Sequence, residues 1–324
     1  MTAEPQWFDD LLPGYSCHEI PLGDQPTVLG EPEDVVPVAT LVRRESALPS
    51  RRAVLYVHGW NDYFFQTHLG DFWAGQGYDF YAVDLRRYGR SWRRGQLGGY
   101  VADLGEYDAE LSACVAEIRA EHDQVLLMGH STGGLVSSIW AADHPGEVDG
   151  VLLNSPWLDL QATAMVRALG RPVVDALGSR APTTVLRLSD SGFYARTLHR
   201  SLGGEWDYDL AMKSSPSQPI RAGWLRAVLQ GHQRVAAGLD IDVPVLVMAS
   251  ARTNFAKKWS EEMRGADTVL DVEQIAHRAI HLGRCVTVVR IDGGLHDLVL
   301  SAEPVRRTVF AEMARWLRGY ASWY

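Results

Sequence analysis

Apolar and polar residues alternate in blocks along most of the chain, with short apolar runs separated by longer stretches of helical spacing. Continuous apolar runs predict strands that are buried on both faces. Their alternation with helices predicts a largely parallel sheet of the α/β class, covered on both sides. The strands we expect are Val36–Val42, Val54–Val57, Phe80–Val83, Val125–Met128, Val151–Leu153, Val245–Met248 and Val286–Ile291.

An apolar stripe at three- and four-residue steps lies between the third and fourth expected strands. This spacing predicts an amphipathic helix that packs on the sheet. The stripe consists of Leu104, Tyr107, Leu111, Cys114 and Ile118. Further helices are expected over Gly134–Ala142, Val272–Leu282 and Val305–Tyr320.

The regular alternation stops at Trp157 and resumes at Asp242. The interval combines helical patterns with glycine, proline and several aromatic residues. Because open α/β sheets bind ligands at the carboxyl ends of their strands, we expect residues 157–240 to form a helical cap, or lid, over that edge. Residues 1–156 and 241–324 would then form one core. The alternative is a helical segment that only completes the core.

The formal net charge of the 324 residues is −9, which argues against a nucleic-acid partner. One short stretch is basic, and we expect it to be a solvated loop: it holds Arg86, Arg87, Arg90, Arg93 and Arg94.

The three cysteines, Cys17, Cys114 and Cys285, give no disulfide framework, and we expect Cys114 to serve in packing. The chain shows neither a signal peptide nor an apolar run of the roughly 20 residues that span a bilayer. These features predict a cytoplasmic protein without an integral membrane segment.

The segment Gly129-His-Ser-Thr-Gly-Gly134 directly follows the expected strand Val125–Met128 and precedes an expected helix. The pattern G-x-S-x-G at such a corner is typical of a nucleophile elbow, which raises a serine Oγ above the edge of the sheet. Glycines on both sides of the serine avoid collisions with the crossing strand and helix. Ser131 is therefore the candidate nucleophile.

A nucleophilic serine needs a base, and the base needs a third group that holds its tautomer. His296 lies in a glycine-containing loop after the last expected strand and is the candidate base. The candidate oxyanion hole consists of the backbone N–H groups of Thr132 and of Trp60, the latter in the His58-Gly59-Trp60 loop. We expect His58 and His130 to be structural supports.

Four motifs together resemble the α/β-hydrolase fold, and more narrowly the branch that holds monoacylglycerol lipases, lysophospholipases and serine aminopeptidases. They are His58-Gly59, Asp84-Leu-Arg-Arg-Tyr-Gly-Arg-Ser91, Gly129-His-Ser-Thr-Gly133 and Gly294-Leu-His296. The resemblance covers about Arg52 to the carboxyl terminus. It implies a Ser-Asp/Glu-His triad in that chain order and a lid over an acyl pocket.

The triad acid departs from the family pattern. In relatives it follows closely on the strand equivalent to Val245–Met248, but no carboxylate occurs there, and an apparent insertion at Ala251–Gly265 comes next. Asp267 lies 29 residues before His296, much as in monoacylglycerol lipases. Asp271 is the alternative acid, although it could instead cap the following helix. Asp159 is a more distant candidate.

Cofactor and metal chemistry is not indicated by any motif. His277 and His281 lie one helical turn apart, as in metal sites, but the glutamate of H-E-x-x-H and a third ligand are missing. The paired glycines elsewhere do not form G-x-G-x-x-G, so no dinucleotide site is expected. We expect no metal and no cofactor.

The sequence thus predicts a serine hydrolase that cleaves small carboxylic esters, such as monoacylglycerols, lysophospholipids or simple acyl esters, through an acyl-enzyme. Trp157, Trp206 and Trp224 are candidate substrate-binding residues. An aminopeptidase or amide hydrolase is the alternative within enzymes, because three acids in the cap could hold a substrate ammonium: Glu205, Asp207 and Asp209. A non-catalytic receptor for a small ligand is the alternative of another class.

Overall fold

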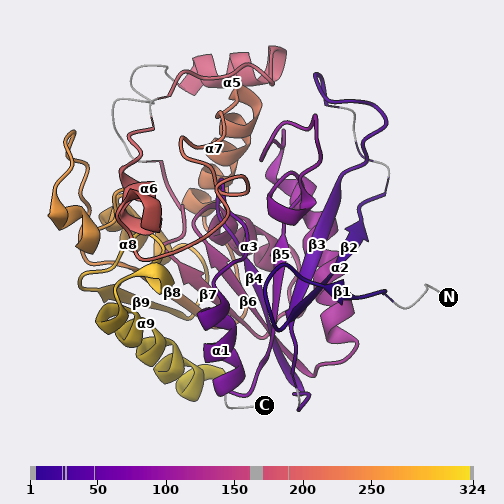
Figure 1. Cartoon of the computed structure of the whole chain (residues 1–324), viewed down its shortest axis with the longest axis vertical. Helices are drawn as coiled ribbons and strands as arrows, with labels where there is room; N and C mark the ends of the chain where they lie inside the picture. Colours follow the sequence, from indigo (N-terminus) through magenta and orange to yellow (C-terminus); the bar gives the residue numbers. More distant parts are fainter. Residues whose placement is uncertain are drawn as a thin grey trace.

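A single nine-stranded sheet runs through the centre of the molecule (Figure 1). The computed structural model describes residues 5–23, 25, 28–46, 48–160, 171–188 and 190–321. The strand order is β1-β2-β3-β5-β4-β6-β7-β8-β9. The strands are β1 (Phe8–Asp9), β2 (Tyr15–Pro21), β3 (Val38–Arg44), β4 (Arg52–Val57), β5 (Asp79–Asp84), β6 (Gln124–His130), β7 (Gly150–Asn154), β8 (Val245–Ser250) and β9 (Val286–Ile291).

The sheet is parallel from β5 to β9 and antiparallel at its amino-terminal edge, where β1, β2, β3 and β5 pair in turn. All the expected strands are present, although β3 begins and ends two residues later than Val36–Val42. Strands β1 and β2 were not predicted from the sequence. The residues of β2 alternate between buried and exposed positions, so this strand lacks the continuous apolar run that marks the others.

Side chains along each central strand point alternately into two separate hydrophobic cores. In β6, Val125 and Leu127 enter one core, whereas Leu126 and Met128 enter the other. The first core lies under α2 (Asp108–Arg119), α3 (Thr132–Asp143) and α8 (Val272–Ala279). The second lies under α1 (Thr67–Gly75) and α9 (Glu303–Trp316). Burial on both faces explains why these strands are apolar throughout.

The helices differ from the expected ones mainly at their ends. The stripe from Leu104 to Ile118 begins with a 3₁₀ turn, Leu104–Tyr107, that leads into α2. The helix expected over Val272–Leu282 ends earlier, at Ala279, and that over Val305–Tyr320 begins at Glu303. Cys114 is fully buried in the first core, as expected. No helix in the described ranges is long and apolar enough to cross a bilayer.

The segment between β7 and β8, residues 155–244, is here called the inserted segment. Its described helices are α5 (Arg171–Arg180), α6 (Phe193–Leu198) and α7 (Ala222–Ala237). Helices α5 and α7 pack against each other at the top of the view in Figure 1, and α6 lies lower in that view. Residues 161–170 and 189 of the expected cap lie outside the described residues.

The expectation of a solvated basic loop is wrong, because its first three arginines are buried in ion pairs. The Arg86 side chain, fully buried, donates from Nε to Glu110 Oε2 at 3.0 Å. Arg87 pairs with Glu31 at 2.7 Å, and Arg90 pairs with Asp84 at 2.8 Å. Arginine forms such pairs well because its planar fork matches a carboxylate.

Replacing Glu110 with alanine should destabilise the fold strongly, because the buried Arg86 guanidinium would keep only the more distant carboxylate of Glu106, at 3.6 Å. We expect the free energy of unfolding in urea to fall by about 3–5 kcal/mol. Glu273→Ala is the matched control, since it breaks an exposed pair with Arg290 and should change stability little. Equal losses in the two variants would contradict this account.

Candidate active site

The turn between β6 and α3 forces Ser131 into an unusual backbone conformation, with φ 54° and ψ −118°. A Cβ at Gly129 would lie 2.7 Å from the carbonyl oxygen of Gly133, and one at Gly133 would lie 2.1 Å from that of His58. Side chains at these two positions are therefore excluded by backbone. The turn has the geometry expected of a nucleophile elbow, and it places Ser131 at the carboxyl edge of the sheet.

Ser131, His296 and Asp267 form a continuous chain of hydrogen bonds. His296 Nε2 lies 3.0 Å from Ser131 Oγ, and its Nδ1 lies 2.9 Å from Asp267 Oδ2. All three residues are buried. The second oxygen of Asp267 accepts from the backbone N–H groups of Val269 and Leu270, each at 2.7 Å. A carboxylate only accepts hydrogen bonds, so His296 Nδ1 carries the proton and donates a hydrogen bond to Asp267. The lone pair of His296 Nε2 therefore faces the serine hydroxyl.

The insertion at Ala251–Gly265 leaves the end of β8 and returns to it. Asp267 N donates to Arg252 O at 2.8 Å, and Asn254 N donates to Asp267 O at 2.8 Å. Asp267 is thereby held against the residues that directly follow β8. The candidate acid Asp267 thus lies next to the end of β8, although it comes later in the chain than the family pattern expects.

The candidate oxyanion donors, the backbone N–H groups of Thr132 and Trp60, belong to segments next to Ser131. Thr132 is the first residue of α3, so its N–H has no acceptor within the helix. Trp60 belongs to the loop His58–Tyr63, which follows β4, and a Cβ at its neighbour Gly59 would lie only 2.9 Å from Ser131 Cβ.

His58 supports this loop from beneath. It is fully buried, and its Nε2 accepts from Leu85 N at 3.1 Å while its Nδ1 donates to Gly59 O at 2.8 Å. Burial lowers the pKa of His58 below its usual 6.5, which keeps the ring neutral. The expected structural role agrees with these contacts.

Asn154, at the end of β7, joins the turn at Ser131 to the loop of His296. Its backbone oxygen accepts from Ser131 N at 3.1 Å and from His130 Nδ1 at 3.0 Å. Its side-chain amide donates to Asp297 Oδ1 at 2.7 Å, and its Oδ1 accepts from Leu298 N at 3.1 Å. Asn154 was not predicted from the sequence. A polar residue at the end of an apolar strand could have indicated a residue of the site.

A cavity of about 180 Å³ opens beside Ser131. Its walls come from the core and from the inserted segment, and many of its side chains are polar. It is lined by Trp60, Asn61, Asp62, His130, Ser131, Asp190, Tyr194, Ala195, Tyr208, Lys213, Ser214, Ser217, Val269 and His296.

A buried ion pair lies in the wall of this cavity. Lys213 Nζ is 2.7 Å from Asp62 Oδ1, and the rings of Phe65, Tyr194 and Tyr208 surround the ammonium at 5.7–5.8 Å. The other oxygen of Asp62 is buried and has no hydrogen-bond partner. Neither residue was singled out in the sequence, because a pair so distant in the chain leaves no local pattern.

Asp62, His130 and Asp297 bring possible metal ligands within 4.8 Å of one another. The ammonium of Lys213 already supplies a positive charge at Asp62. Amide groups of Asn154 and Gln66 donate to Asp297, so this cluster is a network of hydrogen bonds and one ion pair. We assign it no metal.

The three tryptophans predicted to bind substrate lie outside the lining of the cavity. Trp224 packs on Trp60 with ring centroids 4.0 Å apart, and Trp157 packs on Trp224 at 5.9 Å. Trp206 donates to Leu300 O at 2.7 Å. Their role in binding stays a prediction.

The alternative acids have other partners. Asp271 caps α8 by accepting from Glu273 N at 3.0 Å, and Asp159 pairs with Arg278 at 2.7 Å. The acids considered for a substrate ammonium are exposed and do not line the cavity: Glu205, Asp207 and Asp209.

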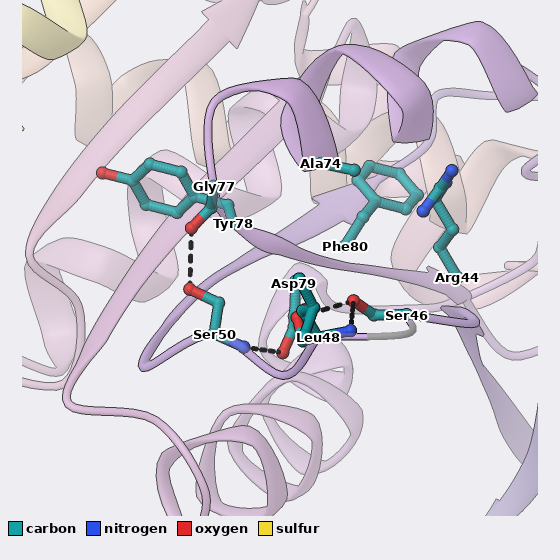
Figure 2. Close-up of a pocket in the computed structure, with 9 residues that line it drawn as sticks. All are labelled: Arg44, Ser46, Leu48, Ser50, Ala74, Gly77, Tyr78, Asp79 and Phe80. Carbon is teal, nitrogen blue, oxygen red and sulfur yellow. Dashed lines mark hydrogen bonds between the residues drawn. The ribbon is translucent and has the colours of Figure 1, made fainter.

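A second, smaller hollow of about 60 Å³ lies at the opposite edge of the sheet, where β4 and β5 begin (Figure 2). Figure 2 shows Ser50 and Asp79 bonded to each other there, with Ser50 N 2.9 Å from Asp79 Oδ2. Ser50 Oγ donates to Gly77 O, so the proton of this hydroxyl is held by a backbone carbonyl and not by a base. The candidate catalytic residues lie at the carboxyl edge of the sheet.

The fold and the elbow at Ser131 define the protein as an α/β-hydrolase. The family model described as "Serine aminopeptidase, S33" matches residues 49–303, and the chain belongs to this family. The fold predicted from the sequence is thereby confirmed.

Two known relatives are also hydrolases by name. The chain is 24% identical to a monoacylglycerol lipase of Mycolicibacterium smegmatis over 274 residues, which are 82% of this chain and 88% of the relative. It is 31% identical to the phospholipase YtpA of Bacillus subtilis over 110 residues, covering 33% of this chain and 41% of that protein.

Solved structures share the fold. The monoacylglycerol lipase of Paleococcus ferrophilus superposes with a TM-score of 0.63 and 19% identity, over 86% of this chain and 98% of the other. A monoglyceride lipase variant of Saccharomyces cerevisiae gives 0.64 and 16% identity, over 92% and 97%. The chain is thus a hydrolase similar to monoacylglycerol lipases.

The lowered pKa of the buried His58 predicts a loss of stability in acid. Below pH 6.5 the unfolded chain takes up a proton that the folded chain excludes, so the free energy of unfolding falls as the pH drops. His58→Gln should therefore narrow the stability difference between about pH 7.5 and about pH 5.5, measured by urea unfolding.

His277→Gln is the control for this test, because His277 is exposed on α8 and should leave that difference unchanged. The same pH dependence in His58→Gln and the unmodified protein would contradict a neutral, buried His58.

Proposed function

We propose that this protein is a serine hydrolase that cleaves small carboxylic esters through an acyl-enzyme on Ser131. The observation that carries the proposal is the buried chain from Ser131 Oγ to His296 at 3.0 Å and from His296 to Asp267 at 2.9 Å. A base within reach of the hydroxyl, held by a carboxylate, is the arrangement that activates a serine.

In the proposed first step, Ser131 Oγ bonds to the carbonyl carbon of the ester and its proton passes to His296 Nε2. Asp267 keeps the ring in place and stabilises the imidazolium that forms. The electron pair of the C=O bond moves to oxygen, where the N–H groups of Thr132 and Trp60 donate to it. His296 then returns its proton to the leaving alcohol, and the acyl group stays on Ser131.

Deacylation repeats these steps with water as the nucleophile, and His296 takes the proton of the water molecule. The inserted segment supplies Tyr194, Tyr208 and Lys213 to the cavity, which supports its role as a cap of residues 157–240 over a core of 1–156 and 241–324. Enclosure by a cap strengthens the electrostatic stabilisation of the oxyanion, because it excludes water.

Esters fit this cavity better than substrates with a free ammonium group. Asp62 and Asp190 are the acids that line the cavity. Asp62 is already paired with Lys213 at 2.7 Å, and Asp190 accepts from the backbone N–H groups of Gly192 and Ser217. A second cation beside Lys213 would be repelled. The relatives named as monoacylglycerol lipases and as a phospholipase support ester substrates.

Hydrolysis of p-nitrophenyl esters of graded acyl length tests the proposal. We expect Ser131→Ala to lose activity by at least about 10³-fold at every chain length, because no other group would attack the carbonyl. Equal turnover by Ser131→Ala and the unmodified protein would overturn the proposed nucleophile. A matched series of p-nitroanilides and aminoacyl amides separates esterase from amidase or aminopeptidase activity.

Asp267→Asn should lower kcat by about 10³- to 10⁴-fold, because an amide cannot hold the same tautomer of His296. Asp271→Asn is the matched control and should leave kcat nearly unchanged, since Asp271 caps α8. Both variants are compared with one p-nitrophenyl ester at saturation. The reverse order of effects would show that Asp271 is the triad acid.

A further inference from the structure

The loop that carries Trp60 is bonded to the inserted segment through one side chain. Asn61 Nδ2 donates to Ser214 O at 2.8 Å, and Asn61 Oδ1 accepts from Ser214 Oγ at 2.9 Å and from Gln218 N at 3.1 Å. Only 9% of Asn61 is exposed. Its side-chain amide thus forms its hydrogen bonds with a segment that begins 153 residues further along the chain.

The residues around Asn61 contact the same segment. Asp62 pairs with Lys213 at 2.7 Å, and Tyr63 Oη accepts from the backbone N–H of Asp209 at 2.9 Å. On the other side of Asn61, the indole of Trp60 packs on Trp224 of α7. Four consecutive residues of the loop therefore contact the inserted segment.

The backbone of Asn61 is left-handed, with φ 52°. Asparagine adopts this conformation more readily than most residues other than glycine, but it still needs local support. Here the support comes from Ser214 and Gln218. The path of the chain directly after the Trp60 N–H is therefore set by contacts with the inserted segment.

We propose that Asn61 is a positioning residue that couples the cap to the oxyanion hole. This inference rests on the proposed function. When Ser131 Oγ bonds to the carbonyl carbon, its proton goes to His296 and the electron pair of the C=O bond goes to the oxygen. The bonds of Asn61 keep the Trp60 N–H aimed at that oxygen. The substrate carbonyl carries little charge before attack, so a displaced N–H slows the reaction more than it weakens binding.

Asn61→Gly tests the proposal, because glycine accepts the left-handed backbone and removes all three bonds. We expect kcat on a p-nitrophenyl ester to fall about 10- to 100-fold, with KM changed by less than about threefold. A trifluoromethyl ketone with the same acyl chain adds to Ser131 and carries an oxyanion. Its inhibition constant should rise in proportion to the loss of kcat/KM.

Ser214→Ala removes one bond from the cap side and should lower kcat less. Combined with Asn61→Gly, it should add almost nothing, because the shared contact is already lost. Ser179→Ala in α5 is the matched control and should leave kcat unchanged, since Ser179 Oγ donates to Asp175 O of its own helix.

The proposal is overturned if Asn61→Gly raises KM at unchanged kcat, if ketone affinity is retained while kcat falls, or if the two substitutions are additive. An unmodified protein that binds the ketone but cleaves no ester refutes the proposed function alone, because ketone affinity still reports on Asn61. If the unmodified protein neither cleaves the ester nor binds the ketone, both proposals fail.

Discussion

The close crossing of β6, α3 and the loop after β4 is the constraint around which the site is arranged. A Cβ on Gly133 would lie 2.1 Å from the carbonyl oxygen of His58, so only glycine fits where α3 passes this loop. The crossing leaves Ser131 at φ 54° on the edge of the sheet. It also brings the loop of Trp60 against Ser131, since a Cβ at Gly59 would lie 2.9 Å from Ser131 Cβ. The placement of the candidate nucleophile beside this loop thus follows from one steric condition.

The order of the parallel strands supplies the other groups. β4, β6, β7 and β8 are consecutive neighbours, so the segments that follow them meet at one edge. Asn154 at the end of β7 bonds both to Ser131 N and to Asp297, the residue after His296. The spacing of Ser131 and His296 is therefore fixed by a buried residue that does not itself touch the serine hydroxyl.

Local sequence patterns predicted the central strands of the sheet and the turn at Ser131. The central strands are apolar throughout because both faces are buried, and the glycines around Ser131 are required by contacts within one turn. The place of Asp267 followed from its spacing to His296. Its physical basis is the return of the 251–265 insertion to Arg252, at the end of β8.

Features that depend on distant partners could not be predicted in this way. The first three arginines of the basic stretch are buried because Glu110, Glu31 and Asp84 face them in the fold, and charge alone does not show this. The ion pair of Asp62 with Lys213 and the bonds of Asn61 likewise join the loop after β4 to the inserted segment. Strand β2, which lies between β1 and β3, was missed because buried and exposed positions alternate along it and it lacks a continuous apolar run.

The central claim is that Ser131 carries the acyl group. The most direct measurement is mass spectrometry of the protein quenched during turnover of a slowly hydrolysed ester, or after reaction with a fluorophosphonate. The account predicts one adduct per chain, located on Ser131 and lost in Ser131→Ala. An adduct on another residue, or undiminished ester hydrolysis without any adduct at Ser131, would contradict it.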